Sequence, residues 1–169
     1  VNVVSTLSGA PDLSEGVDLA IRFGHGRWSD GTVTRLFDER VVPVCSPALH
    51  ARFDGAVSPA GVALLHVQSP EASWISWSDY LRRTAQPPVA GPGRRFTNYV
   101  QATQTALAGQ GVMLGWRSIT GALVETGQLV EAGLPALALD DAYHLVARAK
   151  RGRPATEAFS AWLAGFAQG

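Results

Sequence analysis

An α/β fold is predicted for this chain, because strand-type and helix-type segments alternate along its 169 residues. The strand-type segments are short and rich in β-branched residues. The helix-type segments repeat apolar residues at helical spacing and are bounded by capping residues, proline or glycine. An alternation of this kind is typical of a largely parallel sheet covered by helices. The hydrophobic fraction of 46% fits a folded chain with a core and argues against wholesale disorder.

The strand-type segments are recognised by their β-branched residues or by alternation of apolar and polar positions. Val17–Phe23 alternates in this way and is stopped by Gly24-His25-Gly26. Thr32–Phe37 and Val41–Cys45 form one extended stretch, interrupted by three charged residues. The other predicted strands are Val1–Leu7, Leu64–Val67, Val112–Leu114, Gln128–Val130 and Tyr143–Ala149.

The predicted helices begin at capping residues. Ser46 is followed by Pro47, and Ser58 by Pro59, and each pair places an N-cap side chain before a proline at the first helical position. The other predicted helices are Ser73–Ala85, Thr97–Ala108, Ile119–Thr126 and Thr156–Ala167. Gly109 and Gly127 end two of them, because glycine readily adopts the conformation that follows a helix.

Charge and cysteine content restrict the function classes. Fourteen Lys and Arg residues balance fourteen Asp and Glu residues, so the whole chain has no electrostatic attraction for nucleic acid or an anionic membrane. Cys45 is the single cysteine, which excludes an intrachain disulfide and fits a reducing compartment. No apolar run approaches the roughly 18 residues of a membrane-spanning helix, and the first residues lack the features of a secretory signal.

Signatures of catalysis and metal binding are missing from the sequence. It contains no nucleophile elbow, phosphate-binding loop or zinc-protease motif. Its four histidines stand apart in the sequence, so no metal site is expected, and no cofactor is expected either. Asp140 and Asp141 are adjacent and would point to opposite faces of an extended chain, which favours a solvated turn over a catalytic dyad. Cys45 lies in an apolar run and is expected to be a buried hydrophobe. We therefore expect no enzyme activity, and a small α/β enzyme is the least favoured hypothesis.

A binding site is indicated where an extended stretch runs into the helix predicted at 97–108. Thr97 or Asn98 is the predicted N-cap. The free N–H groups of the first turn and the positive end of the helix dipole suit an anion such as a carboxylate. From these residues alone, simple capping of their own helix explains them better.

The aromatic residues have two interpretations. Trp74, Trp77 and Trp162 have helical spacing to other apolar residues, which predicts packing in the core. Trp116 instead follows a strand end, where ligands tend to bind in α/β sheets. With Tyr99 or Tyr143 it would form an aromatic wall, suited to an ammonium group, whereas the adjacent Arg117 would suit an anion.

Several motifs along the chain occur in an order that resembles that of a known protein family. Ser14–Gly24 resembles the family segment GVDLAIRYG, and Val42–Leu49 is similar to its PVCSPAL segment. Phe96–Tyr99, followed by Ala106–Leu114, resembles the family's AALAGQGVAL helix and strand. The later landmarks are Leu123-Val124, Gly127–Val130 and Tyr143–Val146. These motifs resemble those of LysR-type transcriptional regulators, in the subgroup that contains the glycine-cleavage activator. The resemblance covers nearly the whole chain, and the shared order of the motifs makes it specific.

The resemblance implies a fold like that of type 2 periplasmic binding proteins, with two α/β lobes joined by two crossing strands. Residues 1–42 plus 141–169 would form regulatory lobe I, and 43–140 would form regulatory lobe II. The family's first effector-domain strand and helix would be absent from this chain, so lobe I would be incomplete. DNA would be bound only through an N-terminal domain outside the sequence.

The resemblance also implies a sensing function. A small polar metabolite (an amino acid, a small carboxylate or a quaternary amine) would bind between the lobes and control transcription. The full-length protein is expected to be a cytoplasmic homodimer or tetramer without a cofactor. The expected effector-binding residues are Thr97, Asn98, Tyr99, Phe23, Gly24, His25, Trp116 and Tyr143. The alternative is a solute-binding protein of a transporter, which would use the same fold.

Overall fold

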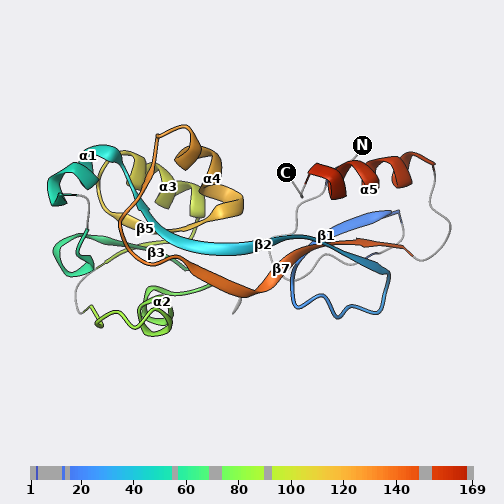
Figure 1. The fold of residues 1–169 in the computed structure, drawn as a ribbon, viewed down its shortest axis with the longest axis horizontal. Helices are drawn as coiled ribbons and strands as arrows, with labels where there is room; N and C mark the ends of the chain where they lie inside the picture. Colours follow the sequence, from blue (N-terminus) through green and yellow to red (C-terminus); the bar gives the residue numbers. More distant parts are fainter. Residues whose placement is uncertain are drawn as a thin grey trace. The chain divides into compact units, whose positions relative to one another are not determined.

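The computed structural model describes residues 3, 13, 16–54, 57–68, 74–89, 93–148 and 154–166. The chain divides into two compact units: unit 1 contains residues 1–39 and 139–169, and unit 2 contains residues 40–138. The chain passes between the units within β2 (Thr32–Cys45) and again within β7 (Leu137–Ala147), the two long strands of Figure 1. The strand predicted at Val1–Leu7 falls outside the described residues, apart from Val3.

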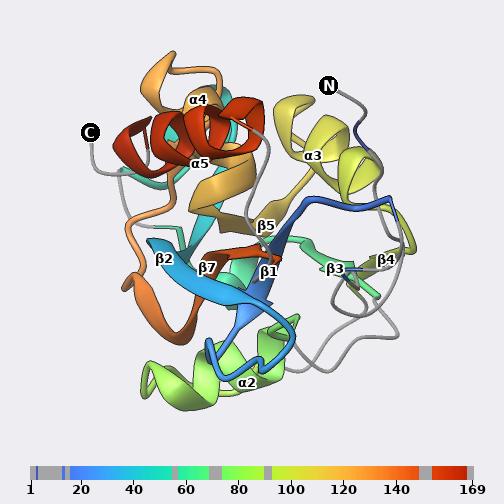
Figure 2. The ribbon, with the colours of Figure 1, turned by 90° about the vertical axis from the view of Figure 1, so that its right-hand side faces the viewer.

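Unit 1 is built on an antiparallel strand pair. β1 (Leu19–Gly24) pairs with β7 from Leu19 opposite Ala147 to Gly24 opposite Ala142 (Figure 2). Ala20, Leu145 and Val146 are buried there. β7 begins at Leu137, so Asp140 and Asp141 lie within a strand and the predicted turn at this position is wrong.

The C-terminal helix of unit 1, α5 (Pro154–Phe166), contains no fully buried side chain between residues 154 and 165. Trp162 stacks on Phe159 with ring centroids 5.5 Å apart and is 58% exposed. The prediction that Trp162 packs in the core is therefore wrong. Helical spacing identifies an apolar face but does not show what covers it.

A charged group is buried in unit 1. The Arg22 side chain is 3% exposed, and its two terminal nitrogens donate to the Asp30 carboxylate at 2.7 and 2.6 Å. The Arg22 guanidinium also lies 5.5 Å from the centre of the Trp28 ring, within cation–π range. The hydrogen bonds from Arg22 lower the pKa of Asp30 below its ordinary value of 3.8.

We expect Asp30→Asn to lower the urea midpoint of unfolding at pH 6. Because folding lowers the pKa of Asp30, the stabilisation by its carboxylate is complete above pH 3.8 and is lost as pH falls through the lower folded-state pKa. The difference between variant and wild type should therefore shrink below pH 3.8. Asp38→Asn removes an exposed pair with Arg35 and should change the midpoint little. A deficit for Asp30→Asn that is unchanged at pH 3 would contradict the prediction.

The sheet of unit 2 is mixed rather than largely parallel, so the predicted strand arrangement is wrong. β3 (Leu64–Val67) pairs in parallel with β4 (Arg94–Phe96) and β5 (Val112–Trp116). The last part of β2 pairs antiparallel with both β5 and β6 (Val130–Glu131). The order of the described strands is β1-β7-β2-β5-β3-β4, with β6 beside β2.

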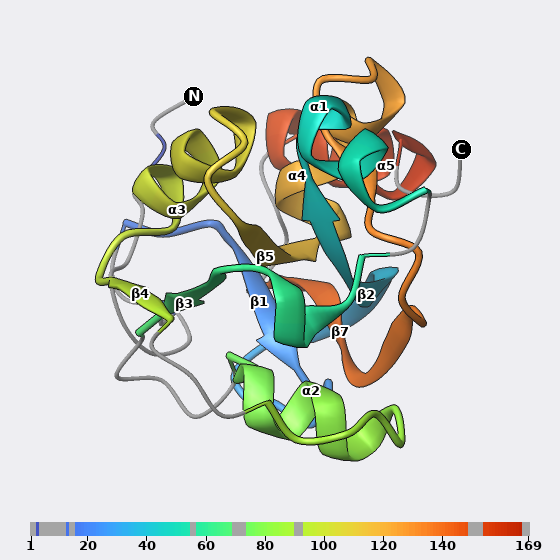
Figure 3. The same cartoon turned by 90° about the vertical axis from the view of Figure 1, so that its left-hand side faces the viewer.

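The helices of unit 2 cover both faces of its strands. Figure 3 shows α2 (Trp77–Arg83) on one face and α3 (Tyr99–Leu107) and α4 (Arg117–Glu125) on the other. α1 (Pro47–His50) begins as predicted at Ser46, whose hydroxyl accepts the N–H of Leu49. The predicted start at Ser58 leads only into a short 3₁₀ turn, 59–61, and a second 3₁₀ turn covers 51–53.

The core of unit 2 lies between α3 and the strands. Its buried members are Val42, Val44, Leu65, Ala102, Ala106, Met113 and Leu129. Cys45 is fully buried in the same unit, and burial raises the pKa of its thiol to about 11. This burial confirms the expectation that Cys45 is a buried hydrophobe. A thiol of this pKa is also a poor nucleophile at neutral pH.

Candidate functional site

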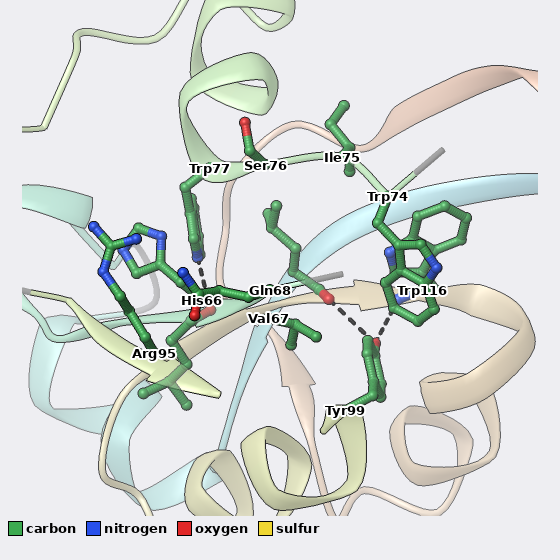
Figure 4. Close-up of a pocket in the computed structure, with 12 residues that line it drawn as sticks. His66, Val67, Gln68, Trp74, Ile75, Ser76, Trp77, Arg95, Tyr99 and Trp116 are labelled. Carbon is green, nitrogen blue, oxygen red and sulfur yellow. Dashed lines mark hydrogen bonds between the residues drawn. The ribbon is translucent and has the colours of Figure 1, made fainter. Parts of the chain in front are cut away.

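A pocket of about 290 Å³ lies within unit 2, where several elements begin or end (Figure 4). Residues 65–68 come from β3 and its end, residues 74–77 from the start of α2 and the chain before it, and Arg95 from β4. Tyr99 is the first residue of α3, and Trp116 is the last residue of β5. The volume is near the lower end of the range for small-molecule sites, roughly 300–1,000 Å³.

One end of the pocket is formed by three rings, Trp74, Tyr99 and Trp116, which we call the aromatic end. The Trp74 ring lies 5.2 Å from that of Tyr99 and 5.0 Å from that of Trp116, and both pairs are tilted. The Tyr99 hydroxyl donates to the carbonyl of Leu114 at 3.1 Å and accepts the N–H of Trp116 at 3.0 Å. These two bonds attach the start of α3 to the end of β5, and so fix Tyr99 relative to Trp116.

The other end of the pocket, the polar end, contains His66, Gln68, Ser76 and Arg95. His66 and Arg95 are direct partners in the parallel pairing of β3 with β4. Burial, and the charge of Arg95, lower the pKa of His66 below 6.5, so its imidazole is mostly neutral at pH 7. Arg95 therefore supplies the positive charge of this end.

One wall of the pocket, on the side of His66, is held by a buried tryptophan (Figure 4). Trp77 is 3% exposed, and its indole N–H donates to the carbonyl of Leu65 at 3.1 Å. Trp77 thus fulfils its predicted core position while also lining the pocket. Trp74, predicted to lie in the core as well, is only partly buried, and it contributes a ring to the aromatic end instead.

The predicted site residues of unit 2 separate into two pairs. Tyr99 and Trp116 line the pocket, as their positions at a helix start and a strand end suggested. Thr97 and Asn98 are exposed and do not line it. The Asn98 side-chain oxygen accepts the N–H of Val100 at 2.8 Å, so Asn98 caps α3.

The remaining predicted residues belong to unit 1 and form a second group there. Phe23 and Tyr143 are opposite each other in the β1–β7 pairing, with ring centroids 5.1 Å apart. Tyr143 also stacks on Phe37 at 4.9 Å. Gly24 ends β1, and the following His25 stacks on Trp28 at 5.8 Å.

Neither a metal cluster nor a membrane-spanning helix is found in the part of the chain that the structure describes. No three His, Cys, Asp or Glu side chains among these residues are placed to hold a metal ion. No helix among them has the length and apolar character needed to cross a bilayer.

Two α/β units connected by two strands, with a pocket at the strand ends of one of them, define a ligand-binding domain. The family is identified by a sequence model of the LysR substrate binding domain, which matches residues 3–168. The chain belongs to this family. Its fold is the type 2 periplasmic-binding-protein-like fold of LysR effector-binding domains, as the resemblance implied.

The curated relatives include transcriptional activators. The glycine cleavage system transcriptional activator of Escherichia coli K12 is 31% identical over 155 residues, covering 89% of this chain and 50% of the relative. The HTH-type transcriptional activator AmpR of Rhodobacter capsulatus is 32% identical over 156 residues, covering 90% and 52%. The chain thus spans about half the length of these relatives. Nothing in these matches supports a solute-binding protein of a transporter.

Solved structures agree with this family. The AmpR effector binding domain from Citrobacter freundii superposes with a TM-score of 0.68 at 26% identity, covering 91% of this chain and 76% of that one. The CrgA regulatory domain from Neisseria meningitidis, a LysR-type regulator, gives a TM-score of 0.66 at 19% identity, covering 89% and 75%. At that identity the second likeness shows the fold alone.

Proposed function

We propose that this chain is the effector-binding part of a LysR-type transcriptional regulator and that it binds a small molecule without transforming it. The observation that carries the proposal is the unit 2 pocket, because it contains Tyr99 and Trp116, two residues singled out from the sequence. The activator names of the relatives support the regulatory role. Units 1 and 2 would be the two regulatory lobes.

The remaining expected contacts would complete the site. The effector would reach Thr97 and Asn98 beside the pocket, and Phe23, Gly24, His25 and Tyr143 of lobe I. Binding would change transcription only if the effector has different affinities for two arrangements of the lobes, and a coupling of about 1–3 kcal/mol is usual. DNA contact would come from a domain outside this sequence, in a cytoplasmic homodimer or tetramer.

The proposal is tested by isothermal titration of the purified chain with a panel of metabolites. We expect at least one small polar metabolite to bind, and Trp116→Ala and Asn98→Ala to weaken its binding. Gln104→Ala, an exposed change on the same helix as the Asn98 cap, is the matched control and should bind normally. Wild-type affinity in both Trp116→Ala and Asn98→Ala would show that the site is elsewhere.

A further inference from the structure

We propose that the effector is a carboxylate with an apolar, flat body, and that Arg95 binds its carboxylate group. This inference rests on the proposed function, because it names the ligand class of the same pocket. It selects one of the three classes that the sequence left open, and it excludes the quaternary amine.

The charge of the pocket favours an anion. Arg95 and His66 are the titratable polar-end residues, and no Asp or Glu is among the described residues that line the pocket. Arg95 is exposed, and its side chain makes no hydrogen bond or ion pair with any residue that the structure describes. Its guanidinium is thus available for the paired hydrogen bonds that a carboxylate accepts.

Asp79, a described acid beside the pocket, does not cancel this charge. Ser76, at the rim of the pocket, donates from its hydroxyl to the Asp79 carboxylate at 2.7 Å. That carboxylate also accepts a hydrogen bond from Arg82 at 3.1 Å, so its charge is already balanced on α2. An ammonium ligand would therefore meet Arg95 without a compensating acid among the lining residues that the structure describes, which is unfavourable.

The aromatic end favours a flat apolar body over a cation. An ammonium cage needs ring faces turned toward the cation, whereas Trp74 packs against both Tyr99 and Trp116 at 5.2 and 5.0 Å. The Tyr99 oxygen is also engaged by the Leu114 carbonyl and the Trp116 N–H. Rings packed and bonded in this way offer mainly apolar surface, which suits a hydrocarbon or aromatic group.

The experiment is a titration of the chain with three matched compounds: phenylacetate, phenylacetamide and 2-phenylethylammonium. Series with propyl and indolyl bodies are added to allow for other shapes. We expect a carboxylate to bind best in its series. Arg95→Gln should weaken it at least about tenfold, since a hydrogen-bonded charge pair is lost. Arg94→Gln is the matched control, because the adjacent residue of β4 points to the opposite face and binds Gln110.

The outcomes separate the ligand class from the function. If an amine or an amide binds best, and Arg95→Gln leaves its affinity unchanged, the ligand class is overturned while the proposed function stands. If Arg94→Gln and Arg95→Gln weaken carboxylate binding equally, the assignment to Arg95 is overturned. If nothing in these series or in the metabolite panel binds at millimolar concentration, both the ligand class and the proposed function fail.

Discussion

Replacing Leu65 with alanine is expected to lower the free energy of unfolding by about 2–5 kcal/mol. The Leu65 side chain is 1% exposed and belongs to the core of unit 2 together with Val44 and Met113. Its truncation removes apolar contacts and leaves a cavity that the pleated strands around it cannot close. The loss should appear in urea unfolding followed by tryptophan fluorescence, because Trp77 donates to the Leu65 carbonyl and reports on this region.

The control for this experiment is Ile119→Ala on α4. Ile119 is 45% exposed, so the same kind of truncation should change the stability of unit 2 by no more than about 0.5 kcal/mol. An equal loss in the two variants would contradict the assignment of Leu65 to the core. If the affinity of Ile119→Ala for the best-binding carboxylate is also unchanged, moderate changes on α4 do not disturb the pocket.

Much of the fold was predictable because local chemistry sets the ends of its elements. Ser46 caps α1, and Asn98 caps α3, as their residue types suggested.

Strand direction was not predictable in this way. A strand connected through a helix to the next is normally parallel to it, and this holds for β3, β4 and β5. β2 and β7 instead cross from one unit to the other, and the sequence does not encode that crossing locally.

The candidate site was only partly predictable. Tyr99 and Trp116 were found because ligands gather at strand ends and helix starts in α/β folds. The same rule, applied to the end of the strand predicted at Leu64–Val67, would have indicated His66. Arg95 was missed because one basic residue beside another carries no periodic signal, and only the pairing of β4 with β3 places it beside His66.

Gly111→Ala is expected to destabilise unit 2 by roughly 2–6 kcal/mol, the sum of backbone strain and overpacking. Gly111 has a φ of +154°, which side-chain-bearing residues rarely adopt. A Cβ atom there would collide with the carbonyl of Ala63 and lie 2.7 Å from Leu65 Cδ2. The same Ala63 carbonyl accepts the N–H of Val112 at 3.0 Å, so the collision occurs where β5 begins to pair with β3.

Gly127→Ala is the comparison, because Gly127 also has a positive φ, +70°, but a Cβ atom there would meet nothing within 4 Å. Its expected cost is only the backbone penalty of the left-handed region, about 1–2 kcal/mol. The excess loss in Gly111→Ala, measured by the same urea unfolding, then combines the collision with Ala63 and Leu65 and the greater strain of a φ of +154°. If the two variants lose equal stability, the tight packing between the start of β5 and β3 does not contribute. If Gly111→Ala also retains wild-type ligand affinity at low urea, the pocket tolerates a shift at the start of β5.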